Sequence, residues 1–205
     1  MGSLEDSLRA ALMYGLVPIW AAAGVGDWFC HRRQRIELSA GVGESLLHLA
    51  MLAILAPATL AVMCLEVNAL VLLLALAACV AHEFVFWIDL VYASRRRVIT
   101  PVEQWVHSVQ FAVPWVGLGA LALLHRGQAL AVLGVAGAPP ADWAWRFKSA
   151  PLPPDYLMAV VLVGALVLGL PFAEEFWRCL RARPYAGRPA GRPAAPDHEG
   201  LATIR

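Results

Sequence analysis

Long apolar runs separated by short polar stretches are the main pattern along this chain. Each of five runs is close to or longer than the roughly 20 residues that an α-helix needs to cross about 30 Å of hydrocarbon. The runs lie near residues 9–31, 43–64, 68–92, 102–124 and 155–180. We therefore predict an all-α membrane protein with about five transmembrane helices, four of which form a bundle around a site.

The two ends of the chain lack this pattern. The first residues, Met-Gly-Ser-Leu-Glu-Asp, carry acids where a signal peptide needs positive charge, so we expect the first apolar run to be retained. Residues 184–205 are rich in Pro, Ala and Gly and contain Gly-Arg-Pro twice, a composition typical of disorder. The predicted organisation is a helical membrane domain at 1–183 and a disordered cytoplasmic tail at 184–205.

The composition supports a membrane protein and limits the classes of molecule that it is expected to bind. The chain is 60% hydrophobic and 15% charged, with a mean hydropathy of +0.64, whereas soluble domains are about 45–50% apolar and about 25% charged. No basic cluster is interleaved with aromatic residues, which argues against nucleic acid as a partner. The four cysteines have no CxxC spacing and are expected to be buried thiols. Membrane lipid is the expected surrounding.

The placement of basic residues predicts an orientation. Arginines follow the first, third and fifth runs, whereas the turn around Glu66 has none. The positive-inside rule then places the N-terminus outside and the C-terminus in the cytoplasm, in what we expect to be a bacterial inner membrane. The connection after the fourth run contains Arg126, Arg146 and Lys148, which weakens this bias without reversing it.

Four histidines fall within the runs, one to a run, and each has a carboxylate at helical spacing. The pairs are Asp27 with His31, Glu44 with His48, His82 with Asp89, and Glu103 with His107. Positions i and i+4, or i and i+7, share one face of a helix. All four pairs also lie toward the predicted cytoplasmic ends of their spans. Because ionisable residues inside transmembrane helices are costly and functional by default, we expect these pairs to meet at one site.

The donor set predicts a metal centre. Four imidazoles and four carboxylates are too many ligands for one ion and suit two. Imidazole and carboxylate without thiolate favour iron, with zinc or manganese as alternatives, and dinuclear carboxylate sites within four-helix bundles are well known.

The pairs resemble the histidine boxes of integral membrane fatty-acid desaturases and hydroxylases, with the first histidine replaced by a carboxylate. Membrane desaturases carry more histidines, and soluble di-iron bundles use ExxH where this chain has ExxxH. The blocks GDWFCHRR, GESLLHLAM and TPVEQWVHS are also similar to a group of small uncharacterised bacterial membrane proteins. The resemblance covers residues 24–110 and implies a metal, with no particular reaction.

Several of these residues have a second interpretation. Thr100, Pro101 and Glu103 form a sequence typical of a capping box, so Glu103 could cap a helix, bind metal, or do both. His31 precedes two arginines and could be a solvated interfacial residue. His82 lies about 10 Å along the helix from Asp89, and Glu83 could replace Asp89 as a ligand.

Other polar residues could support the ligands by accepting the second N–H of a metal-bound imidazole. The candidates are Glu83, Tyr92, Gln110, Glu174 and Glu175. Glu174 and Glu175 could instead pair with Arg178, which is one helical turn from Glu174.

The leading functional hypothesis is a di-iron oxygenase, hydroxylase or desaturase that acts on a lipid-like or other hydrophobic substrate. Such an enzyme needs an electron donor protein as a further partner. A zinc-dependent hydrolase of lipid amides or esters is the alternative within enzymes. Haem-based electron transfer and non-catalytic metal binding are the alternatives outside that class.

Overall fold

The computed structural model describes residues 3–182, and this part of the chain contains helices and no β-strand. Five helical segments are long and apolar enough to cross a membrane: Leu4–Gln34, Val42–Cys64, Ala69–Ser94, Pro101–Leu124 and Pro154–Ala182. The predicted all-α membrane fold with about five spans is therefore confirmed. The tail predicted to be disordered, 184–205, lies outside the described residues.

The first and last segments each contain a π-helical turn. The first consists of α1 (Leu4–Ala11), η1 (Leu12–Leu16) and α2 (Val17–Gln34), and the last of α7 (Pro154–Val163), η3 (Gly164–Gly169) and α8 (Leu170–Ala182). Between them lie η2 (Ile36–Leu38), α3 (Val42–Cys64), α4 (Ala69–Ser94), α5 (Pro101–Leu124) and the short α6 (Arg126–Val132).

Local sequence explains two features of the first segment. The helix begins before the apolar run because Ser3 and Asp6 form a capping box, in which the Ser3 hydroxyl accepts the Asp6 N–H. The π-turn η1 directly precedes Pro18, which has no N–H to donate to the carbonyl one turn earlier. Loss of that hydrogen bond accounts for the wider turn at this place.

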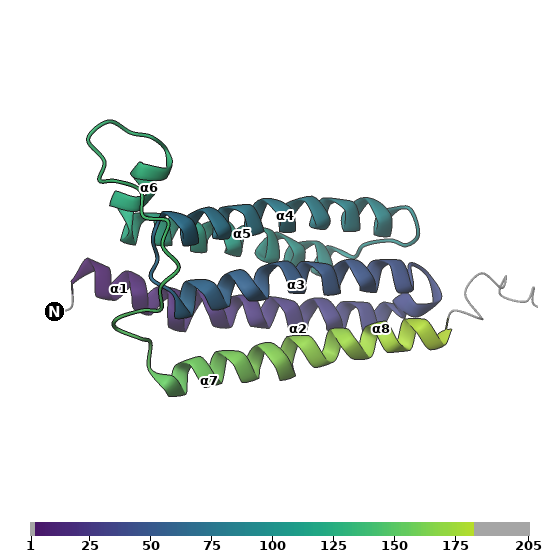
Figure 1. Ribbon diagram of the computed structural model, residues 1–205. Coiled ribbons are helices and arrows are strands. Elements are labelled where there is room, and N and C mark those ends of the chain that lie inside the picture. Colours follow the sequence, from purple (N-terminus) through teal and green to yellow (C-terminus); the bar gives the residue numbers. More distant parts are fainter. Residues whose placement is uncertain (1–2, 183–205) are drawn as a thin grey trace, which may run out of the picture.

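The long helices lie side by side in one bundle (Figure 1). α3 packs against α4 and α8, and α2 packs against α5. α2, α4 and α8 finish at the same end of the bundle at which α3 and α5 begin. We call this the polar end, and we call the other, where α6 lies, the opposite end.

The opposite end is closed by a small apolar core and by the connection after α6. Leu65, Val67, Val71 and Leu72 are buried together. The connection lies against them, since Lys148 N–H donates to the Cys64 carbonyl and Glu66 N–H donates to the Arg146 carbonyl. Large apolar side chains such as Phe84 and Trp105 are exposed on the outside of the bundle, as expected of a surface that faces lipid.

Candidate metal centre

The structure buries all eight predicted ligands, each with at most 5% of its surface exposed: Asp27, His31, Glu44, His48, His82, Asp89, Glu103 and His107. All except His82 belong to one cluster of side-chain contacts at the polar end, which Glu175 of α8 completes. Charged groups are almost never fully buried unless they are paired or bind a metal. The cluster is therefore the candidate site.

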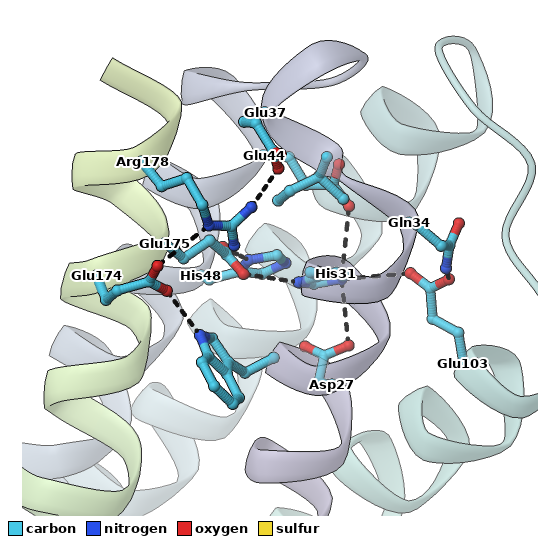
Figure 2. A network of polar contacts seen from close by, with 12 residues as sticks. Asp27, His31, Gln34, Glu37, Glu44, His48, Glu103, Glu174, Glu175 and Arg178 are labelled. Carbon is cyan, nitrogen blue, oxygen red and sulfur yellow. Dashed lines mark hydrogen bonds and ion pairs between the residues drawn. The ribbon is translucent and has the colours of Figure 1, made fainter. Parts of the chain in front are cut away.

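His31 is at the centre of the cluster (Figure 2). Its Nε2 atom lies 3.3 Å from Asp27 Oδ1, 3.3 Å from Glu103 Oε1 and 3.7 Å from Glu44 Oε1. None of these three contacts has hydrogen-bond geometry, and Nε2 is buried without a partner among the described residues. Three carboxylate oxygens from three helices thus surround one ring nitrogen that none of them satisfies.

Glu175 fixes the two central histidines from the other side. Its Oε2 atom lies 3.1 Å from His31 Nδ1, and its Oε1 atom lies 3.0 Å from His48 Nδ1. An ionised carboxylate only accepts hydrogen bonds, so we assign a proton to Nδ1 of each ring. The two rings stack with centroids 4.5 Å apart. In the neutral imidazoles, both Nε2 atoms are then left as acceptors without a hydrogen.

More unsatisfied atoms lie in the same cluster. His48 Nε2, Asp89 Oδ1 and His107 Nδ1 are buried without a hydrogen-bond partner in the part of the chain that the structure describes. His48 Nε2 lies 3.5 Å from Asp89 Oδ2, and His107 Nε2 lies 3.0 Å from Asp27 Oδ1. A buried polar atom without a partner lowers the stability of the fold by about 1–3 kcal/mol. Several such atoms in one place therefore indicate a site for a ligand that would pair with them.

The spacing of the donor atoms fits metal ions. One donor atom from each of Asp27, His31, Glu103 and His107 lies within 4.8 Å of the others, and the same is true of His31, Glu44 and His48. Ligands about 2.0–2.2 Å from a common ion lie no more than about 4.4 Å apart, so the donors would have to approach one another on binding. Small side-chain movements would therefore bring these donors to an ion.

Arg97, from the loop between α4 and α5, joins two of the carboxylates. Its guanidinium contacts Glu44 and Glu103 and also donates to the side-chain oxygen of Gln34, 3.0 Å away. Burial by itself lowers the pKa of Arg97, but its hydrogen bonds and charge interactions with the two carboxylates outweigh burial and raise the pKa above its usual value. Arg97 therefore keeps its charge and holds the acids of α3 and α5 together.

The cluster carries an excess of negative charge. Its five buried carboxylates are Asp27, Glu44, Asp89, Glu103 and Glu175, and its one guanidinium is Arg97. With the carboxylates ionised and the imidazoles neutral, five negative charges and one positive charge leave a net charge of −4. Two divalent cations would neutralise it.

Glu103 has both of the roles that its sequence suggests. Its N–H donates to the Thr100 hydroxyl and its Oε2 accepts from Thr100 N–H, so the capping box is formed. At the same time Oε1 faces His31 Nε2. The cap holds Glu103 at the first turn of α5, where its carboxylate also reaches the centre.

The other supporting candidates separate into two groups. Gln110 donates to Asp27 Oδ2 across 3.4 Å, so it touches the cluster. Glu174 instead pairs with Arg32 and Arg178 and accepts from the Trp28 indole, so it lies beside the cluster. Tyr92 donates to the Ala40 carbonyl and fixes the turn before α3.

His82 is buried but lies apart from the other predicted ligands. Its one close polar contact among the described residues is with its neighbour Glu83, whose Oε1 atom is 3.4 Å from His82 Nδ1. The ring of Phe86 packs against His82 on one side, with centroids 6.2 Å apart, and against His107 on another, 5.5 Å apart. Phe86 therefore separates His82 from the cluster.

The sequence did not single out Arg97 or Gln34 as members of the site. Arg97 belongs to an arginine triplet whose evident role is topological, and Gln34 is an uncharged residue within a second arginine cluster, Arg32, Arg33 and Arg35, that has the same evident role. A signal for Arg97 does exist, because Thr100 and Pro101 fix the start of α5 and thereby place Arg97 close to the first turn that carries Glu103.

Comparison with known proteins gives no neighbour for this arrangement, since no protein-family model, no curated protein and no solved structure matches the chain significantly.

Proposed function

We propose that the chain is a membrane-embedded dinuclear non-haem metalloenzyme, with iron as the metal, that uses O₂ to oxidise a hydrophobic substrate. The main observation in favour of a metal is the environment of His31 Nε2. This atom faces three carboxylate oxygens, while Glu175 accepts a hydrogen bond from Nδ1 of the same ring. Metal-binding histidines typically donate their second N–H to a carboxylate in this way.

Protonation of the histidines is the competing way to balance the charge. A proton on His31 Nε2 would gain no well-formed hydrogen bond, because none of the three nearby oxygens has the required geometry. Protonating both His31 and His48 would also place two positive rings 4.5 Å apart. Two divalent cations avoid both costs and supply the four positive charges that the cluster lacks.

Each residue has a distinct part in this proposal. Asp27, His31, Glu44, His48, Asp89, Glu103 and His107 would hold the metal ions. Glu175 orients His31 and His48, and Arg97 fixes Glu44 and Glu103 from outside the donor set. When bound, two irons supply O₂ binding and electron transfer. Imidazole and carboxylate donors suit this metal.

The proposed oxidation also requires electrons and protons from outside the chain. Inserting one oxygen atom into a C–H bond consumes one O₂, two electrons and two protons and releases one water. An electron donor protein is therefore a required partner. Exposed arginines such as Arg33 and Arg95 lie at the polar end, which supports our proposal that this end faces the cytoplasm, in a bacterial inner membrane. A reporter fused to the C-terminus and active only in the cytoplasm checks this orientation.

The metal content of the protein tests the proposal. Protein purified in detergent should contain about two iron ions per chain, and His31→Ala should lose them. His125→Ala is the matched control, because His125 lies at the opposite end, and its metal content should not change.

Fewer than one metal ion per chain in the unaltered protein, or unchanged metal in His31→Ala, would contradict a metal centre. Zinc in place of iron would favour the hydrolase, in which a metal-bound hydroxide attacks an ester or amide. A Soret absorption band would instead show haem.

A further inference from the structure

A cavity of about 380 Å³ lies within the half of the bundle that is remote from the metal centre. Its deep end is lined by apolar side chains of four helices, namely Trp20, Leu55, Cys79 and Val113. The volume is near the lower limit of about 300–1,000 Å³ that is usual for small-molecule pockets. The lining accommodates a hydrocarbon group and offers it almost no hydrogen-bonding partner.

The cavity is elongated along the bundle. Leu124 lies near its mouth and Val113 at its deep end, eleven residues apart on α5 or about 16 Å along the helix. The volume spread over that length is enough for one hydrocarbon chain. The long axis points from the opposite end toward the metal centre.

Charged residues lie only at the mouth. Arg9 is paired with Glu5, whose Oε1 atom is 2.6 Å away. Glu66 accepts hydrogen bonds from the N–H and the hydroxyl of Ser149, at 2.7 and 2.8 Å. Glu66 is thus already hydrogen-bonded, and Arg9 is largely exposed, with its charge in contact with solvent as well as with Glu5.

Lys148 differs from these neighbours. Its backbone N–H donates to the Cys64 carbonyl, which holds the residue at the mouth. Lys148 is partly buried, and among residues 3–182 its side chain forms no hydrogen bond and no ion pair. Burial lowers the pKa of Lys148, as expected for a cation that lacks a close partner. An anionic group at the mouth would supply that partner.

We propose that the cavity binds a long-chain carboxylate with a single hydrocarbon chain, its carboxylate at Lys148 and its chain extending toward the metal centre. This binding does not depend on the metal centre. That this ligand is the substrate rests on the proposed function, and in that case oxidation occurs near the end of the chain that is remote from the carboxylate.

The remaining distance to the centre is short. His107 lies six residues beyond Val113 on α5, or about 9 Å along the helix. On α4, His82 and Phe86 follow Cys79 in the same direction. A chain longer than the cavity would therefore extend toward His82 and Phe86, and the ring of Phe86 packs against His107.

Displacement of a fluorescent polyene carboxylate, cis-parinarate, tests the binding in detergent on protein treated with a chelator. Palmitate should displace the probe, and palmitate methyl ester should do so about tenfold less well. Lys148→Ala should weaken palmitate about tenfold, as expected for loss of a hydrogen bond to a charged group, and should leave the ester unchanged. Arg146→Ala is the matched control, because Arg146 is an exposed cation two residues away that pairs with Asp142.

Two further variants keep the test decisive. Lys148→Arg should retain tight binding of palmitate. Ala58→Phe, which places a ring in the cavity, should abolish displacement by both ligands without changing iron content. Equal binding of acid and ester together with no effect of Lys148→Ala would overturn the proposal, as would equal displacement by two-chain phosphatidylglycerol. Because metal-free protein is used, this failure is distinct from failure of the metal centre.

Discussion

The two halves of the bundle have opposite interiors, although α2, α3, α4 and α5 run through both. Near the polar end these helices bury Asp27, Glu44, Asp89 and Glu103. Toward the opposite end the same four helices surround an apolar cavity. Within a few turns, each of these helices therefore passes from an interior rich in charged side chains to an interior that has almost no charged side chain.

The difference shows what each half needs to be stable. Buried carboxylates are tolerated only when cations and hydrogen bonds compensate the loss of hydration. The polar half therefore depends on Arg97 and, in our proposal, on metal ions. The apolar half depends on packing, and an occupant of its cavity adds contacts without being required. Variants should consequently affect one half and spare the other.

The largest effect is expected from Arg97→Ala in metal-free protein. The change leaves the carboxylates of Glu44 and Glu103 buried without their guanidinium, and breaking such a buried pair typically costs about 3–5 kcal/mol of unfolding free energy. Metal-loaded protein should lose less, because the ions compensate the same carboxylates. Unfolding by denaturing detergent, with and without a chelator, measures both values.

Arg96→Ala is the control for that change. Arg96 is exposed and its guanidinium lies 3.5 Å from the centroid of the Tyr92 ring, a contact worth about 0.5–1 kcal/mol. Equal losses for the two variants would show that Arg97 does not compensate buried charge, and the contrast between the two halves would weaken.

Glu175→Ala should have the next largest effect. The change leaves Nδ1 of His31 and of His48 without an acceptor, and loss of such a support typically lowers metal affinity about 10- to 100-fold. Competition with a chelator of known affinity measures the change. Glu174→Ala should alter the affinity little, because Glu174 pairs with Arg32 and Arg178 outside the cluster. A similar loss in both variants would count against a bridging role for Glu175.

The part of the cluster that the sequence predicts is the part set by local geometry. Asp27 with His31 is an i, i+4 pair, and so are Glu44 with His48 and Glu103 with His107, and α-helical periodicity alone places each pair on one face. Successive helices run in opposite directions, so the end of one helix and the start of the next lie at the same end of the bundle. This brings the pairs to one level. The five spans follow from the length of the apolar runs in the same direct way.

The positions of Glu175 and Arg97 and the presence of the cavity depend on tertiary packing. Glu175 enters the cluster only because α8 packs against α3, and nothing in the spacing around it distinguishes it from Glu174. Arg97 reaches Glu44 from a loop, where no periodicity applies. The cavity likewise arises from how four helices pack, so no single run of sequence indicates it.

The smallest effect is expected from His82→Ala, which tests where the boundary between the halves lies. His82 and Asp89 are seven residues apart, about 10 Å along α4, and the structure brings Asp89 to His48 while Phe86 separates His82 from His107. We therefore expect about two metal ions per chain and unchanged affinity in His82→Ala, measured as for Glu175→Ala. His107→Ala, its counterpart on α5, should lose metal because His107 contacts Asp27. Loss of metal in His82→Ala would move the boundary about two turns deeper along α4 and make His82 a ligand, as its sequence pattern alone suggests.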